Sequence, residues 1–125
     1  MLGQAKAFSS FSTNDIQQTK AFYEKLGLNV KVEDMMGEML IMQLNGGGTV
    51  LIYPKPNHEP ASFTVLNFPV QDVEKAVDEL TAKGIKFEQY KDLNTDEKGI
   101  SHQDDFAVAW FKDPAGNILS VVKDK

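Results

Sequence analysis

The chain has 125 residues, 42% of them hydrophobic, which is enough apolar sequence for one globular domain with its own core. Its formal net charge is −5 and every basic residue is a lysine, so neither nucleic acid nor an anionic membrane is an expected partner. There is no cysteine, which excludes disulfides, zinc–thiolate sites and a thiol nucleophile. The sequence shows neither a signal peptide nor a membrane-spanning run, so we expect a cytoplasmic protein.

The first half of the chain predicts one strand, one helix and three further strands. A strand starting at Phe8 leads into a helix that Asn14 and Asp15 are suited to cap and that Gly27 is suited to end. Apolar runs at 29–33, 39–44 and 49–53 are typical of strands, and the three glycines at 46–48 predict a hairpin turn.

The second half repeats this pattern. The interval from Asp15 to Asp72 equals the interval from Gly27 to Gly84. Strands are predicted at 86–90, 106–111 and 118–122. The segment 54–60 contains three prolines and separates the halves. We therefore expect an α+β fold, in which a single domain of residues 1–125 contains two βαβββ modules, 4–54 and 61–125, joined by a proline-rich linker.

One stretch of the second half has no counterpart in the first. Residues 92–105 form a polar segment, which predicts a loop directly before the strand that carries Trp110. Such a loop is either a lid that becomes ordered over a ligand or a mobile excursion at the surface, and the sequence favours neither.

Two motifs connect the chain with a known family. The turn Asp113-Pro114-Ala115-Gly116-Asn117 closes the last predicted hairpin, and the helix end Phe22-Tyr23-x-x-Leu26-Gly27 precedes it in the same order as in that family. With these motifs the chain resembles the vicinal oxygen chelate superfamily of glyoxalases, extradiol dioxygenases, and fosfomycin and bleomycin resistance proteins. The resemblance implies that the two modules form a curved mixed sheet around a central cup, and that the chain assembles as a homodimer.

The resemblance also implies where a metal would be bound in relatives that are metalloenzymes. The corresponding positions here are Phe8, Ile52, Val65 and Ser120. Divalent metals in such sites prefer imidazole nitrogen or carboxylate oxygen, and none of these four side chains offers either. We therefore expect no metal, no other cofactor and no catalytic residue carried over from the family.

The remaining expectation is a pocket for a small molecule. Strand alternation places Ser10 and Asn67 on the face that lines the cup, and the resemblance turns Trp110 inward, with Met42 as its counterpart in the first half. A one-residue bulge would instead turn Phe111 into the cup. The predicted ligand-binding residues are Phe8, Ser10, Met42, Ile52, Val65, Asn67, Trp110 and Ser120.

Three functions are compatible with this sequence. The first is a metal-free protein that binds a small cationic or aromatic compound, as bleomycin resistance proteins do, because a tryptophan face and an acidic chain both attract such a ligand. The second is a glyoxalase-like or dioxygenase-like enzyme whose metal has unconventional ligands. The third is a non-catalytic assembly domain. The two histidines, His58 in the linker and His102 in the long loop, are expected to be solvated rather than catalytic.

Overall fold

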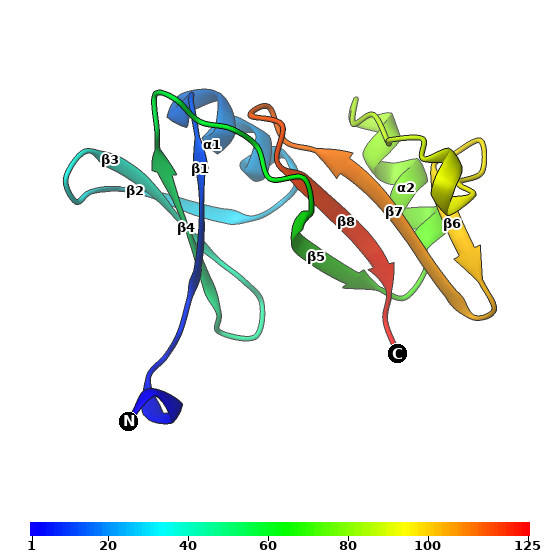
Figure 1. Cartoon of the computed structure of the whole chain (residues 1–125), viewed down its shortest axis with the longest axis horizontal. Helices are drawn as coiled ribbons and strands as arrows, with labels where there is room; N and C mark the ends of the chain where they lie inside the picture. The colour runs from blue at the N-terminus through cyan, green and yellow to red at the C-terminus, as the bar shows by residue number, and fades with distance from the viewer. The chain divides into compact units, whose positions relative to one another are not determined.

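The computed structural model describes all residues from Met1 to Lys125 and divides them into two compact units. The N-terminal unit comprises Met1–Glu59 and the C-terminal unit Pro60–Lys125. Hydrogen bonds group the strands into two four-stranded mixed sheets, one in each unit, and each unit has one α-helix (Figure 1). The predicted α+β fold with two tandem βαβββ modules is confirmed.

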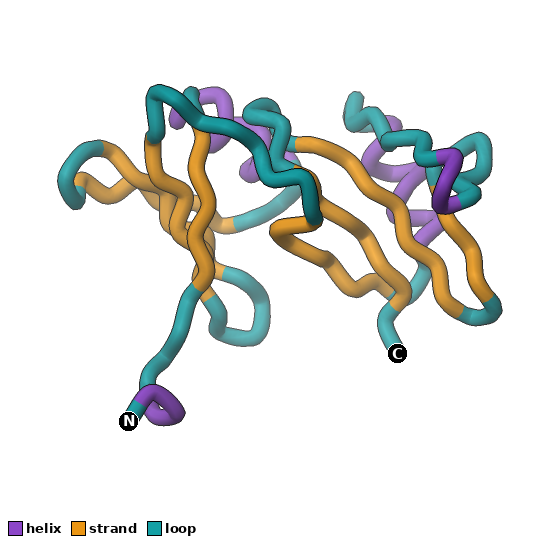
Figure 2. The backbone as a smooth tube through the Cα atoms, in the orientation of Figure 1, coloured by secondary structure: helices purple, strands orange, loops and turns teal.

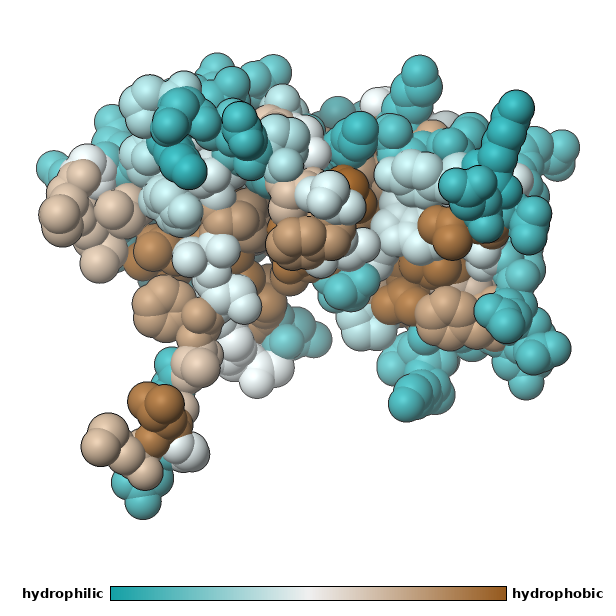
Figure 3. Space-filling view, in the orientation of Figure 1, coloured by the Kyte–Doolittle hydropathy of each residue, from teal (hydrophilic) through white to brown (hydrophobic).

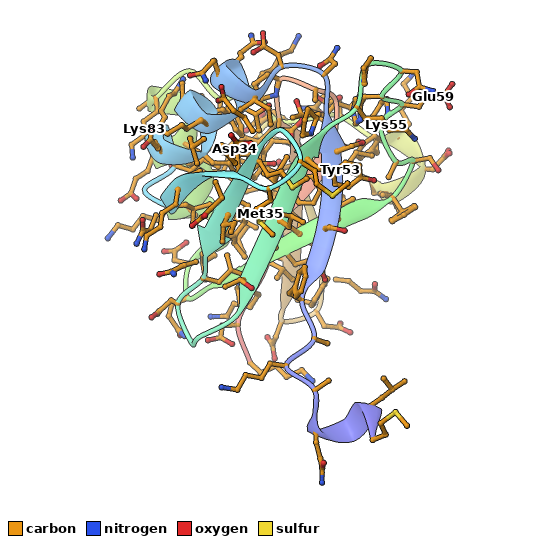
Figure 4. The ribbon with its side chains drawn as sticks, turned by 90° about the vertical axis from the view of Figure 1, so that its left-hand side faces the viewer. Asp34, Met35, Tyr53, Lys55, Glu59 and Lys83 are labelled. Atoms are coloured by element: carbon orange, nitrogen blue, oxygen red, sulfur yellow. The ribbon has the colours of Figure 1, made fainter.

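The sheet of the N-terminal unit has the strand order β1-β4-β3-β2, with β1 parallel to β4 and the other pairs antiparallel. Its elements are a 3-10 turn η1 (Leu2–Gln4), β1 (Ser9–Thr13), α1 (Ile16–Lys25), β2 (Asn29–Asp34), β3 (Glu38–Gln43) and β4 (Thr49–Pro54). Figure 4 shows Asp34 and Met35 at the turn between β2 and β3, and Tyr53 and Lys55 where β4 ends.

The sheet of the C-terminal unit has the equivalent order, β5-β8-β7-β6, with β5 parallel to β8. Its elements are β5 (Thr64–Val70), α2 (Val73–Ala82), a 3-10 turn η2 (Lys91–Leu93), β6 (Ile100–Gln103), β7 (Phe106–Lys112) and β8 (Ile118–Lys123). β8 is a central strand, bonded to β5 on one side and to β7 on the other, so it sets the register between these two strands.

Both helices begin and end as their sequences predict. The side chain of Asp15 accepts a hydrogen bond from the Gln18 N–H, and that of Asp72 accepts one from the Lys75 N–H, both at 3.0 Å. Gly27, which follows α1, has a φ of 93°, a left-handed conformation that glycine adopts without strain. The short polar side chains and the glycine therefore set the length of each helix.

The C-terminal unit differs from expectation along its outer edge. Only Phe87 of the predicted strand 86–90 forms a β-bridge, to Phe111, and the expected long loop contains the strand β6, which pairs with β7. Two separate pieces, residues 87–88 and β6, therefore lie along β7 in the place of one continuous strand. The segment between them, residues 89–99, leaves the sheet; we call it the excursion (Figure 2).

The turn between β7 and β8 is held by a buried carboxylate. Asp113 is 4% exposed, and its two carboxylate oxygens accept hydrogen bonds from the backbone N–H groups of Ala115 and Asn117 and from the Asn117 side chain, at 2.9–3.0 Å. These bonds fix the length of the turn, and a turn of fixed length fixes which residues of β7 and β8 face each other. No helix of the chain is long and apolar enough to cross a membrane.

Candidate ligand-binding site

The sheet of the C-terminal unit has one face under α2 and one face turned away from it, which we call the far face. Leu119, Val121 and Phe111 are at most 3% exposed and lie on the α2 side, whereas their neighbours Ile118 and Trp110 are partly exposed. Because side chains alternate along a strand, Trp110 and Ile118 belong to the far face. This is the face turned to the viewer in Figure 3, where hydrophobic residues gather over β5, β8 and β7.

Three predicted residues form a row across the far face. Asn67 of β5 lies opposite Ser120 of β8, which lies opposite Trp110 of β7. The Ser120 hydroxyl is fully buried and donates a hydrogen bond of 2.6 Å to the Oδ1 of Asn67, whose side chain is exposed. The structure therefore brings together the tryptophan, the serine and the asparagine, and it places Phe111 in the core.

The excursion begins directly beside Trp110. The Glu88 N–H donates a hydrogen bond of 2.8 Å to the Trp110 carbonyl, and the ring of Tyr90 meets the Trp110 indole edge-on, with 5.5 Å between the ring centroids. Burial, and to a smaller extent the Glu88 carboxylate, raises the pKa of Tyr90 above its ordinary value of 10.0. Tyr90 therefore stays a neutral phenol at physiological pH.

The excursion is held in place by polar contacts to its own residues and to α2. The Thr95 hydroxyl accepts a hydrogen bond of 2.9 Å from the Tyr90 N–H, and the Lys98 ammonium lies 3.1 Å from Glu74 and 3.0 Å from Asp78, both on α2. The Asp96 carboxylate accepts hydrogen bonds from backbone N–H groups of its own turn and contacts His102. This segment is therefore an ordered wall in the structure, and His102 belongs to its support.

A pocket of about 690 Å³ lies between this wall and the start of β5. The Trp110 and Ile118 side chains provide apolar surface from the far face, and the rims carry the exposed apolar side chains Phe63 and Leu93. The complete lining is Ser62, Phe63, Thr64, Gln89, Tyr90, Lys91, Asp92, Leu93, Trp110 and Ile118. A mainly apolar pocket with a few polar groups is the usual form of a small-molecule site.

The first-half residues of the predicted site are placed differently. Ile52 is opposite Phe11, whose ring is 6.3 Å from that of Tyr23 on α1, and Met42 lies on the same side; both are fully buried. Met42 and Ile52 thus pack in the core under α1 and do not lie on the far face of this sheet. The far face of this sheet carries instead the row Ser10, Leu51 and Ile41.

The remaining two predicted residues lie outside regular strand structure: one precedes its strand and the other lies at an irregular position within its strand. Phe8 precedes β1 and is 63% exposed. Val65 is half-buried at a register shift between Thr64 and Leu66. Strand alternation gives no direction for a side chain at a register shift or for one outside a strand, so it assigns neither residue to a face of its own sheet.

The residues present do not fit a divalent metal. The far-face rows offer hydroxyl and amide groups, with Leu51 in the place equivalent to Ser120, and no imidazole or carboxylate among them. No group of three or more histidine, cysteine, aspartate or glutamate side chains converges in the structure. His58 is bound to the Ser12 hydroxyl at 2.6 Å, and His102 to Asp96 at 3.0 Å, so each histidine has a structural partner.

Comparison with known proteins agrees with this fold. A family model described as the Glyoxalase/Bleomycin resistance protein/Dioxygenase superfamily matches residues 7–121. The chain belongs to this superfamily. None of the curated proteins matches the chain. Solved structures that match the chain share low sequence identity with it, and the match covers nearly all of both chains.

A glyoxalase family protein from Enterococcus faecalis is 22% identical, with a TM-score of 0.72 over 98% of this chain and 100% of that one. A bleomycin-binding protein complexed with bleomycin is 21% identical, with a TM-score of 0.66 over 98% and 100%. A hypothetical protein, SA1046, from S. aureus is 18% identical, with a TM-score of 0.70 over 97% and 98%. Likeness at this level of identity establishes the shared fold.

Sequence reasoning missed the wall of the pocket. Tyr90 was placed at the end of a strand, and Phe63 belonged to no predicted element. One sequence signal favours a hairpin inside the expected loop: the pair Asp104-Asp105 lies between Ile100–Gln103 and the apolar run from Phe106. Aspartate tolerates the left-handed conformation that turns need, and Asp104 adopts it with a φ of 56°.

Proposed function

We propose that this superfamily member is a metal-free binding protein that sequesters a small aromatic compound in the pocket beside Trp110. The observation that carries the proposal is the meeting of Trp110 and Tyr90 at the wall of a 690 Å³ pocket whose other apolar side chains are Phe63, Leu93 and Ile118. A flat ligand gains both buried apolar area and ring contacts there. A positive charge on the ligand adds cation–π attraction to the indole and fits the net charge of −5.

The non-catalytic part of the proposal is supported by the side chains at the site. No hydrogen bond joins the Ser62 or Thr64 hydroxyl of the pocket to a basic side chain, as an activated nucleophile would require. The far-face row Asn67, Ser120 and Trp110 also lacks the imidazole and carboxylate ligands that a metalloenzyme of the superfamily needs. The bleomycin-binding relative was solved with bleomycin, and this likeness favours binding of an organic compound over the other chemistries of the superfamily.

Binding of 1-methylquinolinium, a flat cationic ring system, tests the proposal. Calorimetric titration and quenching of the single tryptophan should both report binding. Trp110→Ala should weaken it about tenfold, since a lost ring contact and its buried area are worth about 1.4 kcal/mol. Phe106→Ala is the matched control, because Phe106 begins the same strand, is half exposed and lies outside the pocket. Equal losses in both variants, or stoichiometric zinc, iron, manganese or nickel in protein purified without added metal, would contradict the proposal.

We also infer that the chain acts as a homodimer. Each of the two sheets ends in edge strands, among them β2 and β6, and the apolar side chains of Leu2 and Phe8 are 83% and 63% exposed. Unpaired strand edges and exposed apolar side chains favour association. Light scattering should give twice the mass of one 13.9 kDa chain; the mass of a single chain at all concentrations would exclude the dimer.

A further inference from the structure

We propose that Asn67, oriented by Ser120, selects ligands that carry a hydrogen-bond acceptor oxygen beside their aromatic ring. This inference rests on the proposed function, because Asn67 and Ser120 lie on the far face beside the pocket, outside its lining, and extend it by a polar subsite for the same ligand. It starts from the hydrogen bond of 2.6 Å in which the Ser120 hydroxyl donates to the Asn67 Oδ1.

The direction of this hydrogen bond follows from burial. Ser120 is fully buried in the central strand β8, whose backbone groups are engaged with β5 on one side and β7 on the other. A buried hydroxyl proton without an acceptor is costly, whereas an exposed amide N–H can bond to water. The Asn67 side chain therefore turns its oxygen to Ser120 and its nitrogen away from it.

The outward nitrogen gives the far face a pair of hydrogen-bond donors. An asparagine side chain has two N–H donors on Nδ2, and that atom has no partner within the chain. A carboxamide carries no charge, so these donors are neutral. It therefore suits a ketone, carboxamide or ring carbonyl oxygen.

The position of the donors relative to Trp110 determines the shape of the ligand. Asn67, Ser120 and Trp110 are successive members of one row on neighbouring strands, and strands lie about 4.8 Å apart, so the donors are about 10 Å across the sheet from the tryptophan. Ile118, which lines the pocket, shares the far face with Ser120 two residues along β8. A bicyclic ring on Trp110 and Ile118 therefore directs a substituent across Ser120 toward Asn67.

The test compares two probes of equal shape and charge. In 3-acetyl-1-methylquinolinium the substituent carries a C=O group, and in 3-isopropenyl-1-methylquinolinium a C=CH₂ group takes its place; the 6-substituted pair covers the other orientation of the ring. One neutral hydrogen bond corresponds to a preference of roughly three- to tenfold, so the acetyl probe of at least one pair should bind that much more tightly to the unmodified protein.

Two variants assign this preference to the donors. Asn67→Asp replaces the N–H groups by oxygen and should abolish or invert the acetyl preference; any added attraction for the cation acts equally on both members of a pair. Ser120→Ala removes the group that orients the amide and should reduce the preference while the affinity for the isopropenyl probe stays the same. The ratio of the two affinities is insensitive to a general loss of stability, which thermal unfolding of each variant measures separately.

The outcomes separate this inference from the proposed function. Equal affinity for acetyl and isopropenyl probes, with binding that still depends on Trp110, overturns the role of Asn67 and leaves the binding function standing. An acetyl preference that survives Asn67→Asp overturns it as well. If no probe binds, the proposed function fails, and the inference fails with it.

Discussion

A hydrogen bond of 2.6 Å joins the Oγ of Ser12 on β1 to the Nδ1 of His58 in the proline-rich segment. A backbone bond from the Lys55 N–H to the Thr13 carbonyl lies beside it, so the segment that follows β4 is attached to β1 by two contacts. The histidine is thus part of the structure of the N-terminal unit.

His58→Ala should loosen this segment. The loss of a side-chain hydrogen bond from a mostly buried serine is expected to cost about 1 kcal/mol in the free energy of unfolding. It should also speed exchange of the backbone amides at Lys55 and at position 58. Hydrogen exchange and urea unfolding measure both effects. His102→Ala, which alters an exposed histidine of the other unit, should leave exchange in this segment unchanged. Unaltered exchange after His58→Ala would show that Ser12 and the segment are held independently.

Asp113→Ala should be among the most destabilising substitutions of a polar residue in this chain. It removes an acceptor for three hydrogen bonds and leaves the Asn117 side chain, 1% exposed, without that partner. We expect a loss of about 3 kcal/mol in urea unfolding, with Asp105→Ala, in an exposed turn, as a nearly neutral control. A loss similar to that of the control would mean that the turn forms without the carboxylate.

Lys98→Met should release the wall of the pocket from α2. Lys98 contacts both Glu74 and Asp78, and these are the ion pairs between the excursion and the helix. Amide exchange within residues 89–99 should become faster, and 1-methylquinolinium should bind a few-fold more weakly, because ordering the wall then opposes binding. Lys83→Met, at the exposed end of α2, is the control. Faster exchange without weaker binding would show that this wall contributes little to affinity.

Asp96 makes the stability of the C-terminal unit decrease at acid pH. Burial raises the pKa of its carboxyl, but hydrogen bonds from the Ile100 N–H, His102 and the Lys98 N–H outweigh this, and the net pKa lies below the ordinary 3.8. The contribution of Asp96 is therefore complete above pH 3.8 and is lost as the pH falls through the lower, folded-state pKa. Urea unfolding at a series of acid pH values should show this loss in the parent protein and a smaller one in Asp96→Asn. Parallel curves for the two proteins would contradict it.

The sequence predicted the modules and the helix ends because these depend on local signals. Asp15, Asp72 and Gly27 each act on neighbouring backbone, so their effect needs no knowledge of the rest of the fold. Alternation along β5 also placed Asn67 on the far face, whereas Ser120 and Trp110 were assigned to it by the resemblance to the family.

The orientation of Met42 and Ile52 could not be obtained in this way. Ile52 is the residue equivalent to Ser120 only if Gly48 is matched with Gly116. In the structure, however, the Leu44 N–H bonds to the Gly48 carbonyl as the Asp113 N–H bonds to the Asn117 carbonyl. Gly48 therefore corresponds to Asn117, and Leu51 rather than Ile52 corresponds to Ser120. An error of one residue turns every side chain of a strand to the opposite face.

The position of the last edge strand depended on contacts distant in sequence. Both 86–90 and 100–103 can pair with β7, and the structure uses a part of each, with Phe87 bridging to Phe111 and Ile100 lying opposite Ala109. Whether one strand or two short pieces occupy an edge is decided by side chains that pack beneath it, such as the rings of Phe87 and Phe111, 5.3 Å apart.

The interruption of the outer edge strand separates a segment whose sequence can vary from the strands that hold the fold. Gly99 closes the base of the excursion, where a Cβ atom would lie 2.9 Å from the Glu88 carbonyl oxygen, and the sheet on either side of this point holds its register through β7. Substitutions or insertions between residues 89 and 98 can therefore reshape the wall beside Trp110 without moving Ser120 or the core. Variation within this one short segment would therefore alter the proposed binding pocket while the remainder of the chain keeps the fold.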